Sequence, residues 1–162
     1  MNKTTFTENL DEKTLTIDRT FEAPVERVWA AWTQSELLEK WWAPAPWKAR
    51  TKSFDFSKGG HWHYYMEGPE GERHWCLVKY RTIEPQKAFT GFDTFCDEEG
   101  TQNTDLPAME WDNRFKGSNG RTEVRVIATF VSAEDLKRII EMGVKEGFST
   151  AMDQLGALLT GN

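Results

Sequence analysis

The sequence predicts an α+β fold in which one antiparallel sheet curls around a C-terminal helix. Three observations lead to this prediction. Apolar and polar residues alternate with period two through most of the chain, turn residues separate the alternating segments, and one long stretch with helical spacing closes the sequence. The predicted order is one strand, two short helices, six strands and one long helix. Because so little helix covers only one face of a sheet, we expect the seven strands to curve around the final helix.

A single domain accounts for this pattern. The sequence has 162 residues, and a chain of this length buries about 70% of the surface that its unfolded form exposes, so one core suffices. We expect residues 1–12 to be a loose tail and residues 13–160 to form the domain. At its start, residues 13–21 alternate between apolar and polar side chains, which predicts a half-buried strand.

Two short helices follow this strand. Pro24 opens the first, because proline at the first helical position gives up no hydrogen bond, and apolar residues recur with helical spacing as far as Trp32. Thr33 and Glu36 have the spacing of a capping box and begin the second helix. An Ala-Pro-Ala-Pro run at residues 43–46 ends it.

The stretch from residue 47 to residue 130 predicts six strands in an antiparallel meander. Turn signals separate them at residues 58–60, 68–71, 84–86, 97–105 and 116–120. The final helix is then capped by Ser132 and extends to about Leu159. Its apolar stripe must lie on an apolar surface, and the sheet is the surface available.

The turn at residues 68–71 predicts which side chains of its hairpin face inward. If Glu67 lies opposite Glu72, even-numbered residues before the turn share a face with odd-numbered residues after it. The predicted inner face carries Trp62, Tyr64, Met66, Trp75 and Leu77, and the outer face carries His61, His63, Tyr65, His74 and Cys76.

The last hairpin predicts a second apolar face, formed by Met109, Trp111, Asn113, Phe115, Thr122, Val124, Val126, Ala128 and Phe130. The facing of residues 79–96 stays open, because the assumed register turns Lys79 and Arg81 inward. A bulge between Leu77 and Ile83 would turn them outward.

Aromatic residues are the chain's most unusual feature, with 8 Trp, 10 Phe and 3 Tyr. Rings with a few polar tips on an inner sheet face are typical of an apolar ligand pocket, although a filled core would use the same residues. Of the adjacent Trp41 and Trp42 we favour Trp41 for contact with the pocket. The candidate ligand-binding residues are Trp41, Trp62, Tyr64, Met66, Trp75, Leu77, Phe92, Met109, Trp111, Asn113, Phe148 and Met152.

Composition and charge limit the partners. A net charge of −6 is opposite to what binding to nucleic acid needs, and no apolar run is long enough to cross a membrane. The N-terminus lacks the apolar segment of a signal peptide, so we expect a cytoplasmic protein with both cysteines reduced. Its expected partners are a small apolar ligand and, as an alternative, a chaperone or another protein, and the chain is a monomer or a homodimer.

Few groups of residues in the sequence are candidates for catalysis or metal binding. His61, His63, His74 and Cys76 have a spacing that could bind zinc, but on the outer face they would lack supporting residues, so we expect no metal and no cofactor. No nucleophile elbow or phosphate loop is present, and we assign no catalytic residue. The carboxylates available for acid–base work are Asp93, Glu67 and Asp112, which we expect to be exposed.

Six ordered segments resemble a known family. They are Phe21–Trp29, Trp41–Pro44, Lys58–Trp62, Gly68–Gly71, Ile83–Pro85 and Gly143–Leu155. In order and spacing they are similar to bacterial proteins related to the C-terminal domain of the activator of the Hsp90 ATPase, within the START-like, or Bet v 1-like (SRPBCC), superfamily. The resemblance covers residues 13–159. It implies a helix-grip fold, with a cavity between a curved seven-stranded sheet and a long C-terminal helix.

The resemblance implies less about function. ATPase activation belongs to a eukaryotic co-chaperone with a further N-terminal domain, for which this chain is too short. Other superfamily members bind lipids or hormones, act as aromatases or cyclases in polyketide synthesis, or are ring-hydroxylase subunits.

Three hypotheses follow from these observations. The first is non-catalytic binding of a small hydrophobic or aromatic ligand between sheet and helix. The second is an interaction module that regulates a chaperone or another ATPase. The third is a cyclase-type or hydrolytic enzyme, which would need a titratable side chain with a displaced pKa inside the cavity.

Overall fold

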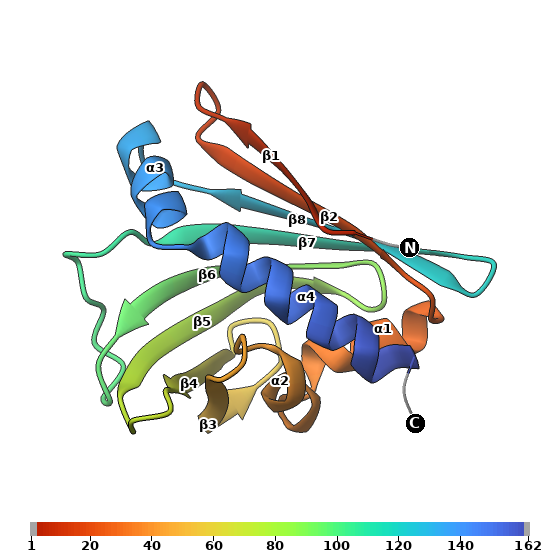
Figure 1. Cartoon of the computed structure of the whole chain (residues 1–162), viewed down its shortest axis with the longest axis horizontal. Coiled ribbons are helices and arrows are strands. Elements are labelled where there is room, and N and C mark those ends of the chain that lie inside the picture. Colours follow the sequence, from red (N-terminus) through yellow and green to blue (C-terminus); the bar gives the residue numbers. More distant parts are fainter. Residues whose placement is uncertain (1–2, 161–162) are drawn as a thin grey trace.

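A computed structural model describes residues 3–160 of the chain. In this range one antiparallel sheet has the strand order β1-β2-β8-β7-β6-β5-β4-β3, and helix α4 crosses its concave face (Figure 1). The strands are β1 (Thr5–Asn9), β2 (Thr14–Phe21), β3 (Lys48–Asp55), β4 (His61–Glu67), β5 (Arg73–Glu84), β6 (Ala88–Cys96), β7 (Met109–Ser118) and β8 (Arg121–Thr129). The helices are α1 (Val25–Thr33), α2 (Ser35–Trp41), α3 (Ala133–Glu141) and α4 (Val144–Thr160). The predicted sheet curved around a C-terminal helix is confirmed.

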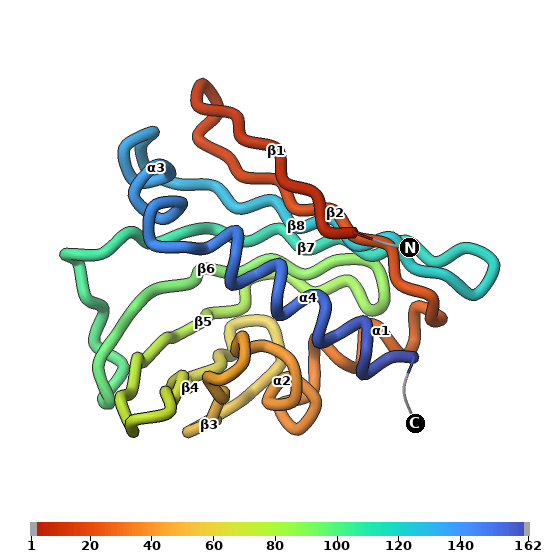
Figure 2. Tube along the Cα trace, viewed as in Figure 1, coloured from red at the N-terminus to blue at the C-terminus, as the bar shows by residue number. Residues whose placement is uncertain are grey.

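The number of strands differs from the prediction, because the described residues form eight strands rather than seven. The extra strand, β1, lies within the segment expected to be a loose tail, and it pairs antiparallel with β2 at the sheet edge (Figure 2). Phe6 packs against the core, and Asn9 closes the turn through hydrogen bonds with Glu12. A short alternation of Thr and Phe therefore suffices for an edge strand once a partner strand is present.

The hairpin of β4 and β5 has a different register from the predicted one. Glu67 lies opposite Arg73 rather than Glu72, so the turn between the paired positions is one residue longer than the four residues assumed, and within it Gly68 is hydrogen-bonded to Glu72. The loop is Pro69-Glu70-Gly71, closed by a hydrogen bond of 2.9 Å from the Gly68 N–H to the Glu72 carbonyl. Gly71 has φ +84°, the left-handed conformation that a three-residue hairpin loop needs at its last position.

A shift of one residue exchanges the two faces of β5. Trp75 and Leu77, predicted to face inward, lie on the outer side, whereas Cys76, Val78 and Tyr80 face inward and are buried. The changed register turns Lys79 outward, and β5 has an irregularity between Tyr80 and Thr82, within the range where a bulge was expected.

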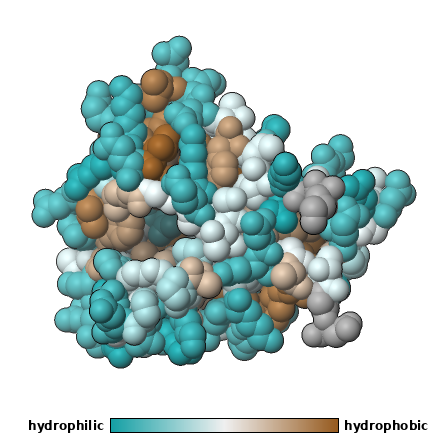
Figure 3. Space-filling model, in the orientation of Figure 1, coloured by the Kyte–Doolittle hydropathy of each residue, from teal (hydrophilic) through white to brown (hydrophobic). Residues whose placement is uncertain are grey.

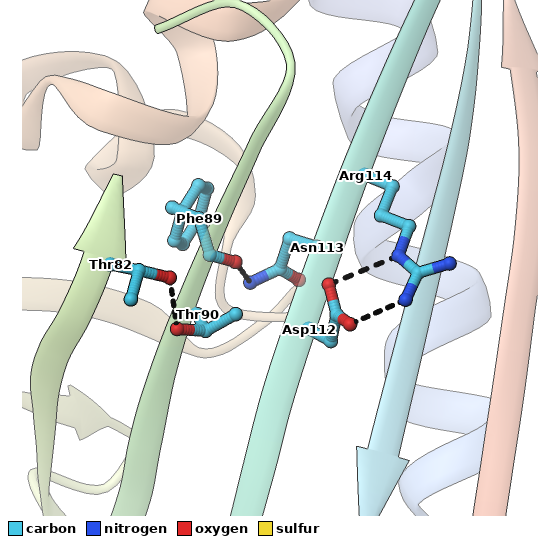
Figure 4. A network of polar contacts seen from close by, with 6 residues as sticks. All are labelled: Thr82, Phe89, Thr90, Asp112, Asn113 and Arg114. Carbon is cyan, nitrogen blue, oxygen red and sulfur yellow. Dashed lines mark hydrogen bonds and ion pairs between the residues drawn. The ribbon is translucent and has the colours of Figure 1, made fainter. Parts of the chain in front are cut away.

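The last hairpin has the predicted faces. Trp111 lies opposite Ala128, and Asn113 lies opposite Val126, both pairs on the buried side. On the outer side Asp112 accepts two hydrogen bonds from Arg114, as Figure 4 shows. The alternation of apolar and charged residues in these strands determines their facing independently of the turn.

The helices begin and end close to the predicted positions, with two differences. Ser132 caps α3 as predicted, its Oγ accepting from the Asp135 N–H, but the second helix is preceded by Gln34, and the Thr33 hydroxyl instead donates to the Trp29 carbonyl. The predicted long helix is broken into α3 and α4 at Gly143, which has φ +96°. A residue in this conformation ends a helix.

The break predicts opposite effects for two glycine substitutions. Gly143→Ala should destabilise the protein by about 1–2 kcal/mol, because alanine disfavours the left-handed conformation. Gly147→Ala should be neutral or stabilising by up to ~1 kcal/mol, because residue 147 is helical and its new Cβ would meet the Pro44 Cγ at an ordinary 3.6 Å. Urea unfolding of both variants measures the difference, and equal effects would contradict it.

Candidate functional site

A cavity of about 400 Å³ lies between the inner face of the sheet and the α3–α4 junction. Strands β4 to β7 form its floor, and the segment after α2 forms one wall. On the face drawn in Figure 3 a hollow is bordered by apolar surface. The cavity is lined by Trp42, Pro44, Trp47, Tyr64, Met66, His74, Cys76, Asp93, Thr94, Phe95, Pro107, Met109, Trp111, Ile139, Met142, Gly143, Val144, Gly147, Phe148 and Ala151.

Seven of the twelve predicted site residues line an internal space. Five of them, Tyr64, Met66, Met109, Trp111 and Phe148, line the large cavity. Trp62 and Asn113 line a second cavity of about 30 Å³, which has Trp42 and Trp111 in common with the first. Asn113 donates to the Phe89 carbonyl at 3.5 Å, so its amide is held inside the sheet (Figure 4).

Three predicted residues lie on the outer face of the sheet and do not reach either cavity. Trp75 and Leu77 are there because of the changed register of β5. Phe92 pairs with Lys79 on the neighbouring strand, and its ring lies under the Arg81 guanidinium at 5.4 Å. These residues cover the outside of the sheet.

The two remaining residues, Trp41 and Met152, belong to the core. Both are 0% exposed, and neither is part of a cavity wall. The Trp41 Nε1–H donates to the Ala31 carbonyl at 2.9 Å, which fixes its ring between the two short helices. The adjacent Trp42 lines the cavity instead, and its Nε1–H donates to the Tyr64 hydroxyl at 2.8 Å.

Sequence reasoning missed most of the helix-side wall, although a signal for it exists. Ile139, Gly143, Gly147 and Ala151 recur at intervals of four residues, and of these Gly147 and Ala151 share one face of α4. Three of them are small, so this face lies over the sheet without filling the space between. On the sheet, sequence reasoning also missed Cys76 and Asp93. The side of the sheet that these residues face depends on the strand register, which the hairpin sequence left ambiguous.

Asp93 is the carboxylate of the cavity wall, and this contradicts the expectation that it is exposed. It extends from β6, and the Trp111 Nε1–H donates to its Oδ2 at 2.9 Å. Burial raises the pKa of the Asp93 carboxyl to about 7, although the hydrogen bond from Trp111 opposes this shift. The group therefore holds a proton over much of the range below neutral pH.

Two neighbouring groups, the Tyr64 phenol and the Cys76 thiol, remain neutral near pH 7. Burial raises the pKa of both the Tyr64 phenol and the Cys76 thiol, and the negative charge of Asp93 raises them further. Cys76 is thus a thiol rather than a nucleophilic thiolate. The wall offers one proton-exchanging carboxyl in an otherwise apolar space.

The four residues considered as a zinc set do not converge. His61 and His63 face outward, where His61 Nε2 lies 2.8 Å from the Ser53 hydroxyl and His63 Nε2 lies 3.1 Å from the Asp97 carbonyl. His74 and Cys76 face the cavity on the opposite side of the sheet. Within residues 3–160 no three His, Cys, Asp or Glu side chains are grouped as metal ligands.

The other two candidate carboxylates lie outside the cavity. Glu67 lies 3.6 Å from the Arg50 guanidinium, and Asp112 forms its ion pair with Arg114 on the outer face. Among the described helices, none is long and apolar enough to cross a membrane.

The architecture defines a helix-grip protein of the START-like class, in which a sheet holds a C-terminal helix with a cavity between them. Residues 22–160 match the family model described as "Activator of Hsp90 ATPase homolog 1-like protein". The chain belongs to this family, and the resemblance inferred from its sequence is confirmed.

Solved structures of related proteins agree with this assignment. Protein Ms6760 from Mycobacterium smegmatis is 36% identical with a TM-score of 0.90, and the match covers 98% of each chain. A protein from Arthrobacter aurescens is 32% identical with a TM-score of 0.91, over 96% of this chain and 91% of the other. The AHSA1 protein from Silicibacter pomeroyi shares the fold at 18% identity, with a TM-score of 0.71 over 90% of this chain and 96% of the other. The search of curated proteins gives no match.

Asp93 predicts a dependence of stability on pH. In the unfolded chain the carboxyl ionises near pH ~4, whereas in the folded chain it ionises near 7, so folding binds a proton between these values. Wild-type stability should fall as pH rises through this window, and the loss should be complete above the folded pKa. The Asp93→Asn variant has no ionisable group at this position and lacks this pH dependence. The difference in free energy of unfolding between the variant and wild type should therefore change in favour of the variant, on the order of 3–4 kcal/mol, from pH 4 to pH 8.

Urea unfolding at several pH values measures this difference. Asp112→Asn is the control, because it removes a carboxylate from the outer face and breaks only an exposed ion pair, which contributes about 0–1 kcal/mol. The prediction would be contradicted if the free energies of unfolding of Asp93→Asn and wild type differed by the same amount at every pH.

Proposed function

We propose that this protein binds a small apolar or aromatic ligand in the cavity between sheet and α4 without catalysing a reaction. The observation that supports this most is the cavity itself, because about 400 Å³ is a volume typical of small-molecule sites. Its wall is mostly aromatic and aliphatic, with few polar groups to orient a ligand.

The aromatic rings that face the cavity restrain one another. The Trp111 and Phe148 rings are stacked with centroids 5.8 Å apart, and Phe148 also meets the edge of Trp42 at 5.8 Å. The hydrogen bond from Trp42 to Tyr64 restrains both of these rings. Because these rings are already placed, a ligand would lose little binding free energy to ordering of the site.

The energetics are adequate for a small ligand. An aromatic ring that buries about 200 Å² gains ~5 kcal/mol from removal of apolar surface from water, before the cost of association. A ligand with two rings doubles this gain. The proposed location is the cytoplasm, and the two free cysteines, Cys76 and Cys96, accord with a reducing compartment.

One observation favours a second function. A carboxyl with a pKa of about 7 is suited to general acid–base catalysis, and Asp93 has this property inside the cavity. An enzyme acting on a bound compound would therefore use Asp93 as its proton-exchanging group. To test this, compounds that copurify with the protein are incubated with it in deuterium oxide. The wild-type protein, but not Asp93→Asn, should catalyse the incorporation of deuterium into these compounds.

A substitution that fills the cavity tests the proposed binding. Ala151→Leu places a larger side chain in the wall from α4 and should weaken binding of the neutral probe N-phenyl-1-naphthylamine by at least about tenfold, because it occupies the ligand's volume. Ala157→Leu is the matched control, since Ala157 is on the exposed side of the same helix. The enhanced fluorescence of the bound probe measures affinity.

Thermal unfolding of both variants shows whether the fold is retained. Equal probe affinity for wild type and a folded Ala151→Leu variant would place the binding elsewhere and contradict the proposal. No binding of the probe by the wild-type protein would also contradict it.

A further inference from the structure

We propose that the cavity takes a protonated organic amine with an apolar or aromatic body, its nitrogen paired with the Asp93 carboxylate. This inference rests on the proposed ligand-binding function and specifies its ligand class. It combines three features of the cavity wall: one acidic group, the absence of lysine and arginine among the described lining residues, and surrounding aromatic rings.

The acidic group of the cavity wall has no lysine or arginine beside it among the described lining residues. Asp93 is the one carboxylate among the described lining residues, and these include no lysine or arginine. The other titratable groups around Asp93 and along the wall are Tyr64, Cys76, Tyr80, Cys96 and His74. The α3–α4 segment contributes only uncharged residues to the wall. An ionised Asp93 therefore has no counter-ion in the wall from lysine or arginine, and an ammonium group on the ligand would supply one.

Asp93 is positioned to accept a hydrogen bond from a ligand. Within residues 3–160, the Trp111 Nε1–H donates to Oδ2, and no side-chain donor is recorded for Oδ1. The indole holds the carboxyl in one orientation in the wall of the cavity. A ligand N–H can then pair with the free oxygen, and a charge-assisted bond of this kind is roughly twice as strong as a neutral one.

The aromatic rings favour the same ligand. The Phe148 ring contacts both Trp42 and Trp111 in the cavity wall. The faces of aromatic rings attract cations, most strongly in sites from which water is excluded. The chain's net charge of −6 further favours the approach of a cation over that of an anion.

The protonation of Asp93 makes this selectivity depend on pH. An amine that binds as an ammonium ion requires the carboxylate form, so binding below the pKa of about 7 must release the carboxyl proton to solvent. Amine affinity should therefore rise with pH up to about 8 and then level off. A neutral ligand has no such requirement and should show little change over this range.

Three matched probes test the ligand class by isothermal titration calorimetry on the full chain at pH 8. They are 2-phenylethylamine, 2-phenylethanol and phenylacetate, which share a ring and differ in charge. The amine should bind at least about tenfold more tightly than the alcohol, and phenylacetate should bind most weakly. In Asp93→Asn, which keeps an acceptor for Trp111, the advantage of the amine over the alcohol should fall below about threefold.

Two further variants isolate the role of Asp93. Asp112→Asn, on the outer face, should retain the advantage of the amine. His74→Gln should retain the pH dependence, because His74 lies at the exposed rim rather than beside Asp93. At pH 6, titrations in two buffers of different ionisation enthalpy should show release of nearly one proton per amine bound.

The outcomes separate this inference from the function on which it rests. If the alcohol and N-phenyl-1-naphthylamine bind and Ala151→Leu blocks them, but the amine binds no more tightly, the ligand class is wrong and the binding function stands. An amine advantage that persists in Asp93→Asn overturns the role of this carboxylate. If no probe binds to wild type, both proposals fail.

Discussion

The three-residue loop Pro69-Glu70-Gly71 determines which side of the central sheet faces the cavity. Because side chains alternate along a strand, the closing pair of Gly68 and Glu72 sets the facing of β5 as far as its irregularity after Tyr80. Cys76 thereby faces inward, and its neighbour on β6, Phe95, faces inward with it. The same alternation places Asp93 opposite Val78 on the inner face of the sheet. A loop one residue longer or shorter would turn Trp75 and Leu77 toward the cavity in place of Cys76 and Val78.

The cavity also depends on how α3 and α4 lie over the sheet. The break at Gly143 changes the direction of the chain, and small residues at 143, 147 and 151 keep the helix-side wall thin. Rings from the sheet and from the segment after α2 form the rest of the wall, and they support one another through edge and stacked contacts. Large rigid side chains opposite small ones leave a volume that neither side fills.

The sequence was sufficient to predict the sheet, the order of elements and the faces of the last hairpin, because each depends on local alternation. Met109, Trp111 and Asn113 were placed correctly for this reason. The site was predicted only in part. Trp75 and Leu77 were misplaced because the turn sequence fits the pairing of Glu67 with either Glu72 or Arg73, and the two pairings differ by one residue. Trp41 and Trp42 are adjacent on a helix, and only the packing of the first against the Ala31 carbonyl determines which one reaches the cavity. Strand β1 was missed because an edge strand needs few residues of its own.

Asp93 is best understood through the free energy that its position costs. A carboxyl among aromatic rings is less stable in its ionised form than it would be in water, and the raised pKa measures this penalty. An apolar residue at position 93 would avoid the penalty and would fit the surrounding wall. A ligand that brings a positive charge offsets part of this penalty on binding, since its ammonium group interacts with the carboxylate in place of the missing water. The penalty in the free protein and the selectivity of the proposed site thus have one physical origin, the desolvation of a single carboxyl.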